Sequence, residues 1–196
     1  YGVDIGCSTD LSIVWKHQKW DYILEWFRDH PKCFATFATK GVNYNMLGYG
    51  GGNNRIRFSL MPQKISDILE PNTASISDRI EAINVFKEAG WDVHINYSPI
   101  IAYKGFLSDY ERLFKEVDSR VHNKDKVFSE CIYLTHSASL HQYNIKQGLN
   151  ESESLLWQPD YQELKQSQYQ SNVLRYERKL KNKMINKFVK LHNEII

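Results

Sequence analysis

Short strand-like runs alternate with helix-like segments through most of this chain, and that order restricts its possible folds more than any other feature. The strand-like runs, rich in β-branched and aromatic residues, are predicted at 3–5, 34–39, 55–61, 93–101 and 131–135. Helical patterns occupy the connections, which are long enough for right-handed crossovers between parallel strands. We therefore predict an α/β fold, either an open sheet or a barrel with fewer strands than a complete eight-stranded one.

The clearest helix is predicted between Ser75 and Gly90. Ser75 can cap the first turn together with Asp78, and Gly90 suits the left-handed conformation that commonly follows a helix. Apolar residues also recur at helical spacing over 20–27 and 107–117. These two segments are predicted to be amphipathic helices that bury one face.

Size and composition limit the class of protein further. The 196 residues suit one domain with a sizeable core, and a formal net charge of +2 is too small to indicate nucleic-acid binding by itself. The sequence has no run of about 18 uncharged apolar residues, so no membrane partner is expected. Three cysteines far apart in the sequence make no disulfide framework and fit a reducing, cytoplasmic compartment.

The character of the sequence changes near residue 137. Residues 137–172 are rich in Gln, Asn, Ser, Glu and Tyr, which predicts irregular, exposed structure. Residues 173–196 are predicted to form a helix with seven Lys or Arg and two Glu. Its charged face could follow a phosphate backbone, or it could simply be solvated. We expect residues 1–136 to form part of a partial barrel and residues 137–196 to belong to the same domain.

Polar loops follow the predicted strands, where parallel α/β folds carry their chemistry. Cys7 lies in the first such loop and could be a reactive thiol in the mouth of a site, or a small residue that fills a turn. Lys40 follows the second strand and could bind a carboxylate or phosphate, or could be an ordinary surface lysine. Cys33 and Cys131 are predicted to be core residues.

Metal and phosphate binding have weak support in the sequence. His136 and His141 are five residues apart, a spacing that matches no structural zinc motif, so no metal site is predicted. The glycine-rich segment 48–54 precedes a strand, whereas a phosphate-binding loop follows a strand and opens a helix. We interpret this segment as a flexible connection.

Several segments, taken in order, resemble the spore photoproduct lyase family of radical S-adenosylmethionine enzymes. The longer stretches that carry the resemblance are Arg55-Ile-Arg-Phe-Ser-Leu-Met-Pro-Gln63, Ile68-Leu-Glu-Pro-Asn-Thr-Ala-Ser75, Asp78-Arg-Ile-Glu-Ala82, Glu88-Ala-Gly90, Tyr97-Ser-Pro-Ile-Ile101 and Tyr110-Glu-Arg-Leu-Phe114. Gly6-Cys-Ser-Thr-Asp10 is similar to the family's Cys-Thr-Ser-Asp turn, and Phe37-Ala-Thr-Lys40 to its Phe-Val-Thr-Lys element. The resemblance covers nearly the whole chain and is less clear from Phe128 onward.

This resemblance implies a partial (βα) barrel of the radical S-adenosylmethionine type, followed by the basic helix. It implies an enzyme in which a reduced [4Fe-4S] cluster cleaves S-adenosylmethionine to give a 5′-deoxyadenosyl radical. In the family that radical takes a hydrogen atom from the thymine dimer called spore photoproduct, whose methylene bridge then breaks. The implied partners are DNA carrying a pyrimidine photoproduct and a reductant protein such as a flavodoxin or ferredoxin.

The resemblance also implies roles for residues near the cofactor. Cys7 matches the cysteine that donates a hydrogen atom to the thymine radical. Lys40 matches the lysine at the methionine end of the cofactor, where its ammonium could pair with the carboxylate. Ser59 matches a serine that contacts the cofactor, and Thr9 stands where the family has a serine near cofactor and lesion.

Three further residues are implied on the substrate side. Arg175 and Tyr176 resemble an Arg-Tyr pair that faces the lesion and the DNA backbone. His136 matches a family histidine at the end of the sixth strand. No residue of the chain is expected to bind a metal.

The chain departs from the family in one respect. The family holds its cluster with Cys-x-x-x-Cys-x-x-Cys, which these 196 residues lack. In the family this motif lies upstream of the matching segment, and residue 1 is Tyr. We therefore expect a fragment that lacks the N-terminal cluster-binding region and is inactive alone. The alternatives are a family member that acts on another substrate, and a non-catalytic nucleic-acid binding module.

Overall fold

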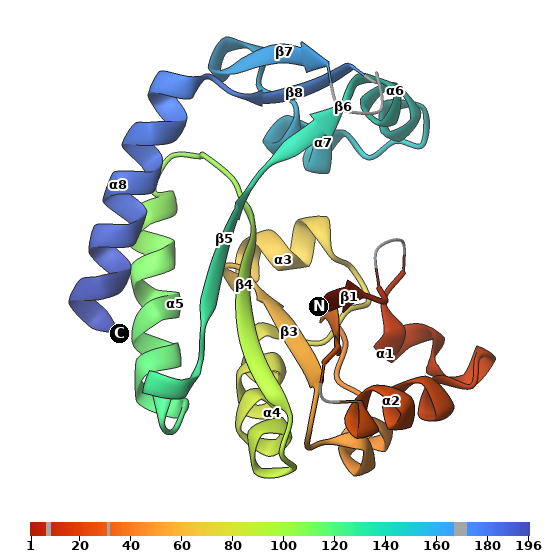
Figure 1. Ribbon diagram of the computed structural model, residues 1–196. Coiled ribbons are helices and arrows are strands. Elements are labelled where there is room, and N and C mark those ends of the chain that lie inside the picture. The colour runs from red at the N-terminus through yellow and green to blue at the C-terminus, as the bar shows by residue number, and fades with distance from the viewer. Residues whose placement is uncertain (7–8, 31, 167–171) are drawn as a thin grey trace.

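A parallel five-stranded sheet forms the centre of the molecule (Figure 1). The structure is a computed structural model that describes residues 1–6, 9–30, 32–166 and 172–196. Along the sheet the strands follow chain order: β1 (Gly2–Asp4), β2 (Phe34–Thr39), β3 (Asn54–Leu60), β4 (Asp92–Ile100) and β5 (Ser129–Tyr133). All four pairings are parallel. The sheet is an open half-barrel, which confirms the expected α/β partial barrel.

Helices connect the successive strands of this sheet. They are α1 (Leu11–Val14), α2 (Trp20–Asp29), α3 (Gln63–Leu69), α4 (Ile76–Glu88) and α5 (Phe106–Arg120), with short 3-10 turns η1 (Trp15–His17), η2 (Tyr44–Tyr49) and η3 (Lys124–Lys126). The capping predicted for α4 is confirmed, because the Ser75 hydroxyl accepts a hydrogen bond from the Asp78 N–H at 3.0 Å. Gly90 follows the helix with φ of 85°.

The two faces of the sheet differ in polarity. Alternate side chains point to opposite faces of a strand, so Ile56 and Phe58 are buried beneath the helices. Phe58 packs edge-on against Phe86 of α4, with ring centroids 5.4 Å apart. The other face carries Arg55 and Arg57, whose guanidinium groups pair with Asp92 of β4 and Asp4 of β1, respectively. A polar inner face suits an open half-barrel that receives a ligand.

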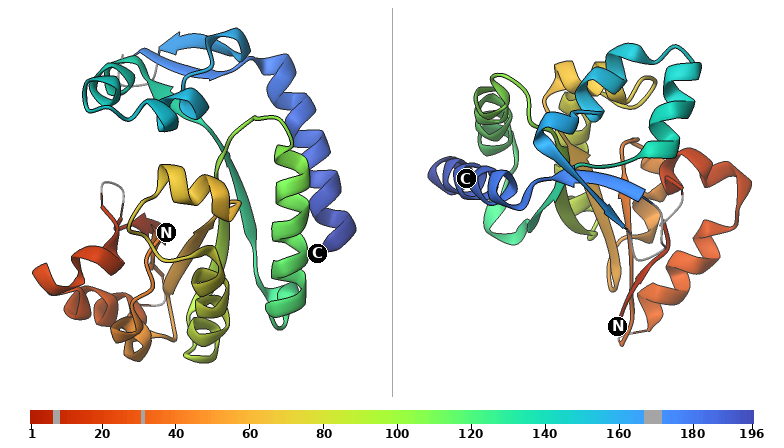
Figure 2. Two further views of the ribbon diagram at one scale, coloured as in Figure 1. Left: turned by 180° about the vertical axis from the view of Figure 1, so that it is seen from behind. Right: turned by 90° about the horizontal axis from the view of Figure 1, so that it is seen from above.

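A second, antiparallel sheet stands beyond the carboxyl ends of the parallel strands (Figures 1 and 2). Its order is β6 (Thr135–Ser137), β8 (Asn172–Tyr176), β7 (Gln162–Gln166). The same part of the chain contains α6 (Ala138–Lys146), α7 (Asn150–Leu156) and the 3-10 turn η4 (Pro159–Tyr161). The prediction of irregular structure over 137–172 was therefore wrong for the residues described there.

The basic helix begins later than predicted. Residues 172–176 form the central strand of the second sheet, and the helix is α8 (Arg178–Ile195). α8 lies alongside α5 (Figure 1) and buries Met184 and Phe188. None of the helices in the described ranges is both long enough and apolar enough to span a bilayer.

Candidate functional site

Three residues singled out from the sequence meet in one depression. Thr9, Lys40 and Ser59 follow or end β1, β2 and β3, whose carboxyl ends are neighbours in the sheet. The depression has a volume of about 180 Å³, and its remaining lining residues are Gly6, Asp10, Ala38 and Thr39. This grouping follows from the topology, because parallel strands bring their carboxyl-end loops to one edge.

Asp10 organises the floor of this depression. One of its carboxylate oxygens accepts hydrogen bonds from the Ser12 N–H (3.0 Å) and the Thr39 hydroxyl (2.8 Å). The other accepts from the Lys40 N–H at 2.8 Å. Asp10 thereby caps α1 and ties it to the end of β2. Sequence reasoning placed Asp10 in this turn but assigned it no role, although an Asp directly before a helical run is a recognisable cap signal.

The ammonium group of Lys40 lies 3.0 Å from Glu70, a buried carboxylate. Glu70 also receives the fully buried guanidinium of Arg79 at 2.9 Å. The same guanidinium donates to the Ser59 carbonyl oxygen at 2.8 Å, which fixes the end of β3. Lys40 and Arg79 thus share the single negative charge of Glu70. The Lys40 ammonium is therefore only partly neutralised and can pair with a second anion.

A second depression begins on the other side of Lys40. It has a volume of about 270 Å³ and is lined by Lys40 and Glu70 together with the α3–α4 connection, Pro99, and Asn144, Leu149, Ser152 and Leu156 of the α6–α7 region. Lys40 therefore lies where two hollows adjoin. An extended ligand with a carboxylate near its middle or end fits this arrangement better than a small anion does.

The described residues do not provide an iron–sulfur site. Cys33 precedes β2 at its amino end, whereas Cys131 lies within β5, so the two thiols belong to different regions of the sheet. Partial burial and the Glu130 charge raise the pKa of Cys131 to about 11, which keeps it a neutral thiol. Cys7, the predicted hydrogen donor, lies outside the described residues.

Arg175 and Tyr176 do not lie on one surface. They are neighbours on β8, so their side chains point to opposite faces of the second sheet. Arg175 is exposed, whereas Tyr176 is 2% exposed and its hydroxyl accepts a hydrogen bond from the Ala102 N–H at 2.8 Å. Burial raises the pKa of Tyr176 to about 12, despite that hydrogen bond. Tyr176 therefore joins β8 to the loop after β4.

His136 lines neither of the two depressions next to Lys40. It is buried on β6, and its Nε2 lies 2.9 Å from a carboxylate oxygen of Glu153 on α7. Burial alone would raise the pKa of Glu153, but hydrogen bonds from His141, Asn144 and His136 outweigh it and lower the pKa. No sequence pattern indicated this cluster, since Glu153 is 17 residues from His136 and no local spacing links them.

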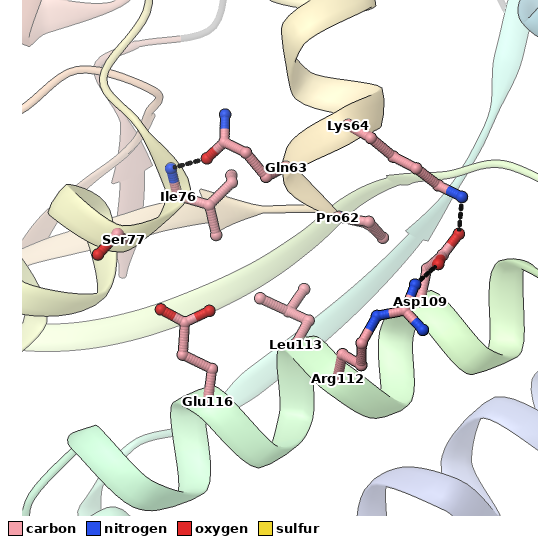
Figure 3. A pocket seen from close by; sticks show the side chains of 9 residues that line it. All are labelled: Pro62, Gln63, Lys64, Ile76, Ser77, Asp109, Arg112, Leu113 and Glu116. Carbon is pink, nitrogen blue, oxygen red and sulfur yellow. Dashed lines mark hydrogen bonds and ion pairs between the residues drawn. The ribbon is translucent and has the colours of Figure 1, made fainter.

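The most voluminous of the described cavities contains none of the predicted site residues. It measures about 450 Å³ and lies between the beginnings of α3, α4 and α5 (Figure 3). Asp109 faces it and is paired with Lys64 at 2.5 Å and with Arg112. Burial favours a higher pKa for Asp109, but hydrogen bonds from Lys64 and Tyr103 lower it. Lys64 and Arg112 already compensate the charge of Asp109, so this cavity indicates no charged ligand.

Comparisons with known proteins match a family and a fold. The family model described as spore photoproduct lyase matches residues 4–195. None of the curated proteins matches the sequence. Among solved structures, a substituted spore photoproduct lyase with bound AdoMet and dinucleoside spore photoproduct superposes with a TM-score of 0.87 at 17% identity. A spore photoproduct lyase complexed with dinucleoside spore photoproduct superposes with a TM-score of 0.85, also at 17% identity. At this identity the structural matches show the fold. They cover 100% of this chain, which spans 58% of each of those proteins.

Proposed function

This chain belongs to the spore photoproduct lyase family, and on that premise we propose that it forms the cofactor- and substrate-binding part of an enzyme that repairs a thymine photoproduct in DNA. The observation that carries the proposal is the depression shared by Thr9, Lys40 and Ser59. These residues come from three separate loops, and the sequence resemblance independently assigns all of them to the cofactor. The implied reductant protein, such as a flavodoxin or ferredoxin, remains part of the proposal.

The depression fits the amino-acid end of S-adenosylmethionine. The Lys40 ammonium is available to the methionine carboxylate, and the Thr9 and Ser59 hydroxyls can exchange hydrogen bonds with its polar groups. The 180 Å³ hollow is too small for the whole cofactor, so the rest must extend past Lys40 or out of the mouth. When bound beside a reduced [4Fe-4S] cluster, S-adenosylmethionine supplies radical chemistry. The ligands for that cluster are not among the described residues.

Cys7 is proposed as the hydrogen-atom donor. Gly6 and Thr9, which flank Cys7 and Ser8 in the sequence, both line the depression, and this supports the assignment. In the proposed step the S–H bond breaks and a C–H bond forms on the thymine product. The sulfur radical left behind returns to a thiol when it takes one electron, which the proposed reductant protein can supply, and one proton.

Removal of the Lys40 charge tests the cofactor assignment. We expect Lys40→Ala to weaken S-adenosylmethionine binding by about 10- to 100-fold, because a charge-assisted hydrogen bond contributes about 1.5–3 kcal/mol. Isothermal titration calorimetry on the complete protein measures this affinity. Lys183→Ala, which removes an exposed lysine of α8, is the matched control and should bind like the parent. Equal affinity of Lys40→Ala and the control would remove Lys40 from the site.

A further inference from the structure

A second polar cluster lies outside the proposed cofactor site, between β6, α6 and α7. His136, His141 and Glu153 each direct one ligand-type atom to a common centre, and these atoms lie within 4.8 Å of one another. The Glu153 carboxylate oxygens lie 2.9 and 3.1 Å from His136 Nε2. One of them is also 2.5 Å from His141 Nδ1. Three side chains from three elements therefore converge on one point beneath the surface.

The surroundings of the cluster resemble those of a built site. His136 is 4% exposed and Glu153 is 2% exposed. The Asn144 amide donates to the other Glu153 oxygen, which fixes the orientation of the carboxylate. The indole of Trp157 stacks on the His141 ring, with centroids 4.1 Å apart and planes within 10°. Such supporting contacts orient ligands around metal ions in proteins.

The distances suit a small transition-metal ion. Bonds of about 2.0–2.1 Å from a tetrahedral ion to imidazole nitrogen and carboxylate oxygen place ligand atoms about 3.3 Å apart. A Glu153 oxygen lies 2.9 Å from His136 Nε2 and 2.5 Å from His141 Nδ1, both shorter than that value, so side-chain rotations that move these atoms apart by less than about 1 Å would open the centre for an ion. The buried carboxylate of Glu153 also favours a cation, because a bound metal ion would compensate its negative charge.

We propose that His136, His141 and Glu153 form a binding site for one divalent transition-metal ion of the zinc type. Two imidazoles and one carboxylate are the donor set of open zinc sites, in which water completes the coordination. The sequence alone did not reveal this site, because the spacing of His136 and His141 matches no metal motif and the third ligand, Glu153, comes from a different helix. The site is independent of the proposed cofactor, since none of its three ligands lines the depression at Lys40.

Bound metal would fasten the α6–α7 pair to β6. This pair closes the second depression, because Asn144 and Ser152 line it and the Ser152 hydroxyl donates to the Ile68 carbonyl oxygen at 3.1 Å. Asn144 thus contacts both Glu153 and the depression next to Lys40. A bound metal would therefore have a structural role, because it would hold one wall of the second depression in place.

Cobalt(II) titration of the protein after dialysis against a chelator tests the proposal. We expect one Co²⁺ per chain, with visible d–d absorption and without the near-ultraviolet charge-transfer band of thiolate ligands. Zn²⁺ should displace Co²⁺ and raise the midpoint of thermal unfolding. Glu153→Gln and His141→Phe should each weaken Co²⁺ binding at least about 100-fold, and Asn144→Ala about 10-fold.

The variants are chosen to keep the fold. Glu153→Gln retains the shape of the side chain and one hydrogen-bond acceptor, and His141→Phe retains the stack on Trp157. His17→Phe, which removes an exposed histidine elsewhere, should bind Co²⁺ like the parent. If the parent binds no stoichiometric Co²⁺, or if His141→Phe binds it as tightly as the parent, the three residues form only a hydrogen-bonded cluster and the proposal is wrong. The titration of the parent protein tests the site even if a variant does not fold.

Discussion

At the scale of single residues, the site depends on side chains that hold the carboxyl ends of the strands in place. The Asp10 carboxylate accepts hydrogen bonds from four groups on α1 and at the end of β2, and Arg79 joins the end of β3 to Glu70. Neither residue needs to touch a ligand in order to matter. Asp10 itself lines the depression and Arg79 does not, and together they set the positions of Lys40 and Ser59.

Replacement of Cys7 tests its proposed chemistry. In the complete enzyme, Cys7→Ala should still cleave S-adenosylmethionine, because the thiol acts only after the substrate radical has formed. Without its hydrogen donor, that radical should yield side products instead of repaired thymine. Chromatography of the products with mass spectrometry measures the ratio. An unchanged product distribution would exclude Cys7 as the donor, and Cys33→Ala serves as the control.

Removal of the buried Arg79 guanidinium should destabilise the fold strongly. Arg79→Met leaves Glu70 buried with only the partly exposed Lys40 as counter-charge, so we expect a loss of about 3–5 kcal/mol in the free energy of unfolding. Urea denaturation measures it. Arg178→Met, at an exposed arginine, should change stability by less than about 0.5 kcal/mol. A double variant that also carries Glu70→Gln should recover part of the loss, and no recovery would contradict the pairing.

At the scale of elements, the strands and helices with strong periodicity were predictable and the short ones were not. Residues 34–39 form β2 with the predicted bounds, because β-branched and aromatic residues recur along them without a turn residue. Residues 173–176 were assigned to the basic helix, because Arg175 belongs to its run of basic residues, but they form most of β8. Pairing with β6 and β7 on either side overrides that local preference.

The candidate site was likewise predictable only in part. Lys40 and Ser59 could be placed at one edge because parallel strands align their carboxyl ends. The partnerships of Asp10 with Lys40 and of Glu153 with His136 join residues 30 and 17 positions apart. Such contacts depend on how loops and helices pack, and no local spacing encodes them.

The contact between α8 and α5 should make the protein sensitive to acid. His192 of α8 lies edge-on to the rings of Tyr97 and Phe114, and burial lowers its pKa from 6.5, although the Asn193 side chain opposes the shift. Its Nε2 is buried without a hydrogen-bond partner among the described residues. The folded state therefore takes up a proton at lower pH than the unfolded state does.

The sign of this effect is fixed by the direction of the shift. Above the unfolded pKa of about 6.5 His192 is neutral in both states, and below it the unfolded state binds the proton first. Stability should thus fall between about pH 7 and pH 5, and His192→Phe should flatten that fall. Urea unfolding at several pH values measures both. His94, whose pKa is also lowered by burial, should contribute to the fall that remains, and His17→Phe, at an exposed histidine, is the control variant.

At the scale of the whole molecule, α8 presents one apolar and one cationic face. Met184 and Phe188 are buried, whereas the lysines at 179, 181, 183, 187 and 190 are exposed. If this face contacts DNA, the observed affinity should fall steeply with salt, by about 0.9 logarithmic units per phosphate contact for each tenfold rise in concentration. Binding without a salt slope would leave the lysines simply solvated.

A charge-reversal pair tests that assignment. Lys183→Glu with Lys187→Glu should lower the salt slope by about 1.8, the value for two lost contacts. Lys16→Glu with Lys19→Glu changes the net charge equally but acts on exposed residues between α1 and α2. Fluorescence anisotropy with a labelled duplex at several salt concentrations measures both. Equal slopes for the two pairs would show that only net charge matters.

The packing of α8 on α5 has a consequence for the newly made chain. Phe188 is fully buried among Tyr97, Tyr110 and Phe114, with ring centroids 5.8, 4.8 and 5.1 Å away. About 60 residues separate the end of α5 from the start of α8, so at about 5–20 residues per second the ribosome needs about 3–12 s to cross them. During that interval the aromatic surface of α5 has no cover from α8. We therefore expect chaperones to bind the nascent chain during this interval, until α8 covers the aromatic surface.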